Sequence, residues 1–198
     1  MKAIGLSRSR IEKIAQSVTK DFDPNVLTEL CNLDIERLYE QYIPKRFGIS
    51  TGYQELSRGI HGYTNPTKLE SAVSVTLVDS SDTSTRRFGR STIGHETGHC
   101  VLHAHQFRKK QVLDAFLHDG PHDVSQKLFR QEDIKAFESP EWQAWEFCKS
   151  LFLPRKLLIS AAEKGCSIRQ ISEITDLNPA FVETRLRNLR MLDKVRAF

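Results

Sequence analysis

Two histidines and a glutamate occur close together in the stretch His95-Glu96-Thr97-Gly98-His99. Residues four apart lie on one face of an α-helix, so His95 and His99 can present their imidazoles to a single metal ion. Glu96 is rotated about 100° from His95 around such a helix. Its carboxylate then lies beside the metal, where it can take a proton from water. The stretch predicts a hydrolase with one zinc ion per chain, His95 and His99 as ligands and Glu96 as catalytic base.

A catalytic zinc ion usually has three protein ligands, so a third is needed. His105 follows His95 by ten residues, as the third histidine does in metzincins. That pattern also needs a glycine at position 102 to turn the chain, and this chain has Leu102. His103 shares a helical face with His95 but lies two turns away. This spacing favours a contact with a ligand or substrate, or a plain surface position, over metal binding.

Glu141 is the third ligand that we favour. It begins a segment whose apolar residues recur three and four apart, namely Ala144, Trp145, Cys148, Leu151 and Phe152. A carboxylate in line with an apolar stripe is costly to bury unless a positive charge compensates it, as a zinc ion would. The structural alternative is a first-turn acid stabilised by the helix dipole. Glu138 and Glu146 are expected to be surface acids.

The elements that must position these residues can be read from the local pattern. The apolar positions of residues 9–20 predict a helix. The alternation and β-branched residues of 71–78 predict a strand, which residues 59–63 can pair with. A polar loop at 79–84 supplies candidate helix caps for a helix over about 86–104 that carries the motif. Ser139-Pro140 then begins a helix that runs to about Phe152.

The last forty residues predict a pair of short helices with the proportions of a helix-turn-helix. Ser167 and Gln170 have capping-box spacing, and Asn178-Pro179 begins the second helix. That helix carries three arginines that could contact DNA, namely Arg185, Arg187 and Arg190. The alternative, which we favour, is that Phe181, Leu186 and Leu189 dock the pair onto the rest of the protein while the arginines face solvent. DNA contact therefore stays open but is not favoured.

Composition sets broad limits on the fold and the environment. The chain has 198 residues, a net charge of +4 and 39% hydrophobic residues, which predicts one core domain over 1–160 with a small helical subdomain over 161–198. The surplus of positive charge is too small to demand a nucleic-acid partner. No apolar run is long enough for a signal peptide or a membrane span. Four cysteines without CxxC spacing indicate reduced thiols, so we expect a cytoplasmic protein without membrane contact.

Two segments resemble the signature of the ImmA/IrrE metallopeptidases. Arg87-Phe88 and the stretch from Ile93 to His103 resemble the family pattern RRF-x-x-A-HELGH-x-x-LH. The stretch from Glu141 to Pro154 resembles E-x-Q-A-N-x-F-A-x-x-LLMP, and the resemblance covers roughly residues 55–192 in order. The family's third zinc ligand then falls on Glu141. Thr97, Trp145 and Cys148 depart from the usual residues, and Trp145 replaces the asparagine that normally supports the site.

The resemblance implies an α+β fold, with a mostly helical zincin-like core and a small sheet packed on the motif helix. It also implies limited proteolysis of a protein substrate, a transcriptional repressor in mobile-element, prophage or stress control. Residues 106–138 are longer than usual and are expected to form a lid or specificity loop. His61, Tyr63 and His103 are candidates for stabilising the oxyanion, without a basis for choosing among them. The alternative function is a DNA- or protein-binding regulator whose metal site is structural or inactive.

Overall fold

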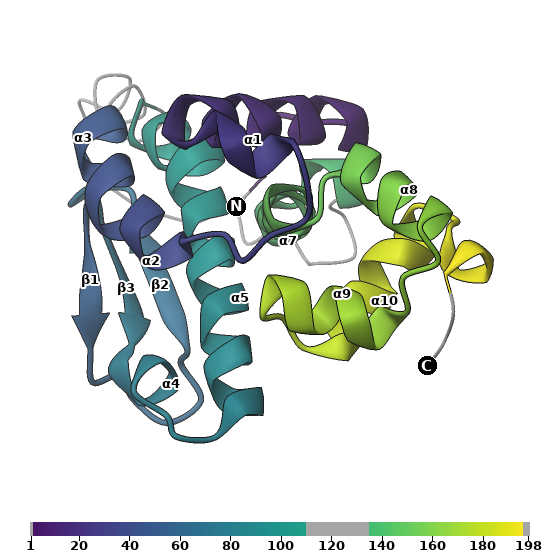
Figure 1. Cartoon of the computed structure of the whole chain (residues 1–198). Coiled ribbons are helices and arrows are strands. Elements are labelled where there is room, and N and C mark those ends of the chain that lie inside the picture. The colour runs from purple at the N-terminus through teal and green to yellow at the C-terminus, as the bar shows by residue number, and fades with distance from the viewer. Residues whose placement is uncertain (1, 110–134, 196–198) are drawn as a thin grey trace, which may run out of the picture.

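A computed structural model gives the α+β architecture of the chain and describes residues 2–109 and 135–195. Helix α5 (Thr83–His99) runs through the middle, between a three-stranded sheet and the helices of the C-terminal half (Figure 1). The segment 110–134, which contains most of the expected lid or specificity loop, lies outside the described residues. The other helical elements are α1 (Arg8–Phe22), η1 (Pro24–Leu27), α2 (Ile35–Arg37), η2 (Leu38–Tyr42), α3 (Ile43–Phe47), α4 (Val75–Val78), η3 (Cys100–Ala104), η5 (Ala136–Glu138), α7 (Pro140–Phe152), α8 (Arg155–Glu163), α9 (Ile168–Thr175), α10 (Pro179–Asn188) and η6 (Leu192–Lys194).

The sheet has the strand order β1-β3-β2. The central strand β3 (Glu70–Ser74) pairs in parallel with β1 (Ser50–Gln54) and antiparallel with β2 (Gly62–Asn65). The predicted strand over 71–78 is therefore too long, because its second half forms the helical turn α4. At the end of β3, the N–H of Ser74 donates a hydrogen bond to the carbonyl of His61, the residue just before β2. Beyond that point β3 has no partner strand within residues 2–109 and 135–195.

Helix α5 begins earlier than predicted, at a cap in the polar loop before it. The carboxylate of Asp82 accepts a hydrogen bond from the N–H of Thr85 at 2.8 Å, which satisfies one of the free donors of the first turn. After His99 the helix widens into the π-helical turn η3. The structure therefore confirms a helix that carries the motif. It starts three residues before the predicted start at residue 86, and its last turn, up to residue 104, is π-helical.

Helices α5 and α7 cross at close range because two glycines of α5 lie in the contact. A Cβ atom on Gly98 would come within 2.9 Å of the carbonyl oxygen of Ala144, and one on Gly94 within 2.9 Å of the sulfur of Cys148. The start of α7 is the predicted one, with Ser139 as N-cap and Pro140 in the first turn. The crossing brings the first turn of α7 to the last turn of α5, where the motif lies.

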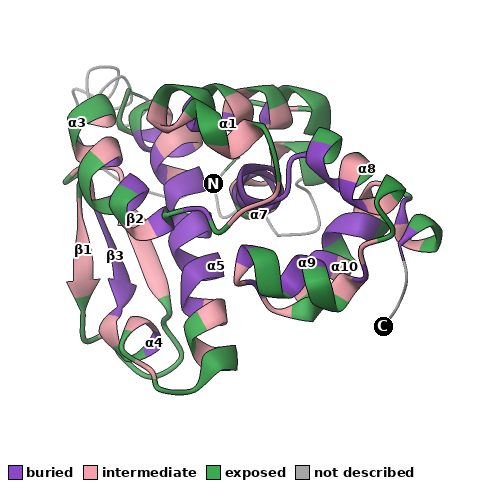
Figure 2. Ribbon diagram, viewed as in Figure 1, coloured by how far each residue is buried: buried purple, intermediate pink, exposed green. Residues whose placement is uncertain are grey.

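The helices α9 and α10 contact α5 through polar and apolar groups. The guanidinium of Arg87 donates to Asp176 at 2.8 Å, and Arg90 donates to the main-chain carbonyl of the same residue. Buried apolar residues of the pair, including Val182 and Leu186, are part of the same hydrophobic core as α1, α5 and α7. Figure 2 shows this burial on the inner sides of the helices, with exposed residues on the outer sides of α1, α9 and α10.

Three charged residues are more buried than the sequence predicts. Glu146 is only 1% exposed, because α1 and α10 cover it, and its carboxylate contacts Lys149 at 2.6 Å and Arg8 at 3.4 Å. Glu138 is partly buried and pairs with Lys2. Arg185 is also buried, with its Nε donating to the main-chain carbonyl of Leu153. The apolar stripe alone could not reveal this ionic cluster, because Lys149 lies on the same helix but Arg8 comes from α1.

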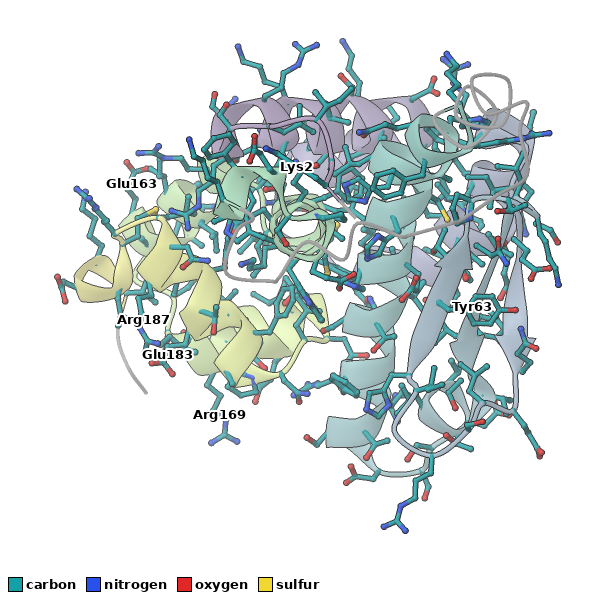
Figure 3. All side chains as sticks on the ribbon, turned by 180° about the vertical axis from the view of Figure 1, so that it is seen from behind. Lys2, Tyr63, Glu163, Arg169, Glu183 and Arg187 are labelled. Atoms are coloured by element: carbon teal, nitrogen blue, oxygen red, sulfur yellow. The ribbon has the colours of Figure 1, made fainter. Side chains whose placement is uncertain are left out.

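The remaining two arginines of the C-terminal pair are exposed, as predicted. The side chain of Arg187 pairs with Glu183 one turn earlier on α10. Figure 3 shows these two residues together on the outer side of the pair, with Arg169 of α9 pointing away from the protein. Arg187 is therefore already paired with a residue of the same helix. Arg185 is too buried to contact a ligand.

Candidate metal centre

Three side chains of the two crossing helices converge on one point. The Nε2 atoms of His95 and His99 lie 3.1 Å apart. One carboxylate oxygen of Glu141 is 3.2 Å from Nε2 of His95, and the other is 3.3 Å from Nε2 of His99. His95 is buried and His99 half-buried, whereas Glu141 is open to solvent. These are the three ligands predicted from the sequence, and together they could hold a metal ion.

The donor set and its spacing fit a small divalent cation. Zinc bonds of about 2.0–2.1 Å in a tetrahedral site place neighbouring ligand atoms about 3.3 Å apart, close to the three distances found. Two imidazoles and one carboxylate form a set used by catalytic zinc, which keeps a fourth position open. The same set also suits iron, so the geometry supports a metal site without choosing the ion. The histidines hold the pKa of Glu141 far below its usual range through hydrogen bonds.

Glu96 lies beside this group and is almost fully buried. Its carboxylate accepts a hydrogen bond from the hydroxyl of Thr64 at 2.7 Å. A Cβ atom on Gly62 would come within 2.9 Å of the same side chain, so the strand can approach only because that residue is glycine. Burial raises the pKa of Glu96, and the hydrogen bond from Thr64 opposes part of that rise. A carboxylate in this setting can exchange a proton with a bound water.

The contact from Thr64 belongs to a chain of hydroxyl groups beneath the sheet. The Oγ1 atom of Thr64 is 2.9 Å from the hydroxyl of Ser71, which is directly opposite on β3. The hydroxyl of Tyr39 donates to the same serine at 2.8 Å. Tyr39 is completely buried and lies in the π-helical turn η2. The network connects Glu96 to the sheet and to the helix that packs on it.

His103 is buried behind the predicted metal ligands rather than being a surface residue. Its Nδ1 is 3.1 Å from Nδ1 of His99, and its Nε2 is 3.0 Å from the amide oxygen of Gln143. Burial lowers the pKa of His103 to about 4, so the ring is neutral at pH 7. His103 therefore contacts His99, one of the predicted metal ligands, and the surface alternative is wrong.

His95 is held in a different way. The indole of Trp145 lies against its imidazole, with ring centroids 4.3 Å apart and planes inclined by 35°. The Nδ1 atom of His95 is buried and has no hydrogen-bond partner among the residues described. Trp145 stands at the position where the family pattern has asparagine. Aromatic packing is the contact that restrains this imidazole.

The remaining candidates from the sequence do not join the group formed by His95, His99 and Glu141. His105 is exposed on the next turn, with its Nε2 2.7 Å from the carbonyl of Phe47. The hydroxyl of Tyr63 accepts a hydrogen bond from Gln54, and its side chain lies on the opposite face of β2 from Gly62 and Thr64. His61 is exposed and packs edge-on against Phe88. None of these contacts assigns an oxyanion-stabilising residue.

Comparisons with known proteins add information on the fold. No family model matches the chain, and no curated protein matches it. Among solved structures, a Mycobacterium tuberculosis transcriptional regulator is similar with a TM-score of 0.56 and 13% sequence identity. The similarity covers 89% of this chain but 46% of that chain, so this protein spans less than half the length of the structure it matches. At this identity the similarity shows a shared fold.

Two further structural features bear on the protein's setting. In the described part of the chain, no helix is both long and apolar enough to cross a membrane. The four cysteines carry free thiols. Cys148 donates from its sulfur to the main-chain carbonyl of Ser91 at 3.3 Å, so this buried thiol contributes to the contact between α5 and α7.

Proposed function

We propose that the protein is a zinc-dependent endopeptidase. The observation that supports this most strongly is the convergence of His95, His99 and Glu141 within bonding distance of one ion, with Glu96 beside them. A bound zinc ion would supply a Lewis acid for a peptide carbonyl. The exposure of Glu141 leaves the group open to a substrate on one side. A purely structural zinc site is normally closed by a fourth protein ligand, and no fourth His, Cys, Asp or Glu joins this group in the described residues.

Glu96 would act as the general base and then the general acid. It takes a proton from the attacking water, and it returns that proton to the amine that leaves when the peptide bond breaks. Its burial favours this exchange, because a raised pKa brings the carboxyl group closer to neutral pH. Thr64 keeps the carboxylate in place during both transfers.

The outer edge of β2 offers a place for an extended peptide. In an antiparallel pair, alternate residues exchange hydrogen bonds with the neighbouring strand. The bond from the N–H of Ser74 to the carbonyl of His61 puts Tyr63 in the bonded set. The peptide groups of Gly62 and Thr64 therefore point to the other edge, where β2 has no further strand among the described residues. A substrate that pairs there would lie beside the two residues that contact Glu96.

The biological substrate that we propose is a transcriptional repressor in the cytoplasm. Two facts support it: the resemblance of the two motif segments to the ImmA/IrrE peptidases, and a structural neighbour that is itself named a transcriptional regulator. The zincin-like description of the core and the division into residues 1–160 and 161–198 belong to the same proposal. The second segment would serve to hold or recognise the partner.

A second candidate function is that of a transcriptional regulator in which the metal site is structural or inactive. The name of the structural neighbour favours it directly. The exposed surface of α10 argues against DNA contact through that helix, because Arg185 is buried and Arg187 is paired with Glu183. Recognition of a protein partner is compatible with the same surface.

The test combines metal analysis with cleavage of a mixed library of extended peptides, read by mass spectrometry. We expect one zinc per chain in the wild type, and cleavage that is lost in Glu96→Gln while zinc stays bound. His95→Ala should lose zinc. Glu141→Ala should bind it much more weakly. Zinc binding without cleavage, together with a salt-dependent mobility shift of labelled DNA, would instead support the regulator.

A further inference from the structure

We propose that Gln143 and His103 are positioning residues that select the tautomer of the metal ligand His99. In that tautomer Nδ1 carries the proton and Nε2 presents its lone pair to the ion. The inference rests on the metal-binding part of the proposed function and not on proteolysis. It follows from donors and acceptors that can be assigned one after another along the hydrogen bonds from Gln143 through His103 to His99.

The amide of Gln143 fixes which groups donate and which accept along this series of hydrogen bonds. The amide nitrogen of Gln143 lies 2.8 Å from the carbonyl oxygen of Ile4 and 2.7 Å from that of Phe137. Carbonyl oxygens only accept, so the NH2 end of the amide must face them. The amide oxygen must then face His103. Gln143 has no exposed surface, and a reversed amide would leave two buried carbonyls against an oxygen.

The orientation of the Gln143 amide determines which nitrogen of His103 carries the proton, and this in turn determines the protonated nitrogen of His99. The amide oxygen of Gln143 accepts, so the Nε2 atom of His103 at 3.0 Å must donate. A neutral imidazole carries one proton, which leaves Nδ1 of His103 as an acceptor. The partner of that acceptor is Nδ1 of His99 at 3.1 Å, which must therefore carry a proton. The remaining nitrogen of His99 is the Nε2 atom that faces Glu141.

Main-chain hydrogen bonds between two segments that are far apart in the sequence hold Gln143 and its partners in place. The segment before α1 donates its N–H groups from Ala3 to Glu138 and from Leu6 to Phe137, each at 2.9 Å. This pairing fixes the two carbonyls that accept from Gln143. Metal ligands are commonly oriented by such outer contacts, and here the orientation depends on a strand-like contact between residues 3–6 and 137–138. His95 has no equivalent chain, since its Nδ1 lacks a partner in the described structure.

The test measures zinc affinity by competition with a chromophoric chelator, with no substrate present. His103→Leu and Gln143→Met keep the volume of the side chain and remove the hydrogen bonds. We expect each to weaken zinc binding about 10- to 100-fold. His103→Asn places an amide oxygen near the former Nδ1 and should recover part of the loss. His105→Phe is the matched control, because His105 is an exposed histidine that takes no part in these hydrogen bonds. The zinc affinity of this variant should equal that of the wild type.

A second measurement reads the tautomer itself in the wild-type protein. In zinc-loaded protein at pH above 7, the ¹⁵N shifts of His103 should show a protonated Nε2 and an unprotonated Nδ1. A proton on Nδ1 of His103 would overturn the inference, even if the variants fail to fold. Unchanged zinc affinity in folded His103→Leu would also overturn it. Failure of the wild type to bind zinc at all would instead refute the metal-binding proposal from which it starts.

Discussion

The indole of Trp145 packs at a tilt of 35° against the imidazole of His95, the most buried of the three convergent side chains, with ring centroids 4.3 Å apart. The indole comes from α7, the same helix that carries Glu141. One helix thus supplies both a predicted metal ligand and the surface that restrains a second one. Since Nδ1 of His95 lacks a hydrogen-bond partner among described residues, the orientation of this ring depends on packing.

Removing the indole should therefore loosen the metal site. We expect Trp145→Ala to weaken zinc binding about 10-fold, as loss of an outer contact typically does. Trp145→Phe keeps an aromatic face against His95 and should retain most of the affinity. Chelator competition on both variants, with circular dichroism to establish folding, makes the comparison. Equal affinities in the alanine and phenylalanine variants would show that the stacking has no part in holding His95.

The close crossing of α5 and α7 should be sensitive to one methyl group. In Gly98→Ala the new Cβ would lie 2.9–3.0 Å from the backbone of Ala144, which cannot move without displacing α7 and Glu141. We expect a loss of about 1–3 kcal/mol in the free energy of unfolding and a weaker metal site. Gly52→Ala is the control, because a Cβ there meets nothing within 4 Å. Urea unfolding of the two variants should differ clearly, and equal midpoints would contradict the account.

The three metal-site side chains could be predicted because their positions depend on helical periodicity. His95 and His99 are fixed by a spacing of four, and Glu141 by its place at the head of an apolar stripe. The supporting residues could not be predicted in the same way. Thr64 reaches Glu96 through the pairing of two strands, and Gln143 reaches His103 across a helix crossing. Such contacts depend on tertiary packing, which a single sequence does not display.

The errors of the sequence reading have the same origin. The alternation of residues 71–78 is a sound local signal for a strand, but β3 ends where its antiparallel neighbour turns away at His61. The sequence predicts Glu146 on the surface, but α1 and α10 cover it, and its cations are Lys149 on its own helix and Arg8 on α1. One feature of the sequence does indicate a helix contact. The glycines at 94 and 98 are spaced four apart on one face of the motif helix, which is typical of a close helix contact.

The burial of Glu146 predicts a large effect on stability. Its carboxylate meets Lys149 and Arg8 and also accepts a hydrogen bond from Asn188 at 3.2 Å. Glu146→Ala leaves Lys149 buried without a counter-charge, so we expect a loss of about 3–5 kcal/mol in unfolding free energy. Glu163→Ala, on the outer face of α8, should change it by less than about 0.5 kcal/mol. Chemical denaturation measures both, and a loss near zero for Glu146→Ala would mean that the charge cluster is not formed.

Thr64 provides the last prediction, which separates positioning of Glu96 from metal binding. Thr64→Val keeps the shape of the side chain and removes the donor to Glu96, so zinc content should be unchanged while peptide cleavage falls about 10-fold. The lost hydrogen bond had lowered the pKa of Glu96, so the acidic limb of the pH–rate profile should move to higher pH. Thr64→Ser keeps the hydroxyl and should restore both the rate and the profile. A slower Thr64→Val enzyme with an unshifted acidic limb would assign Thr64 a structural role only.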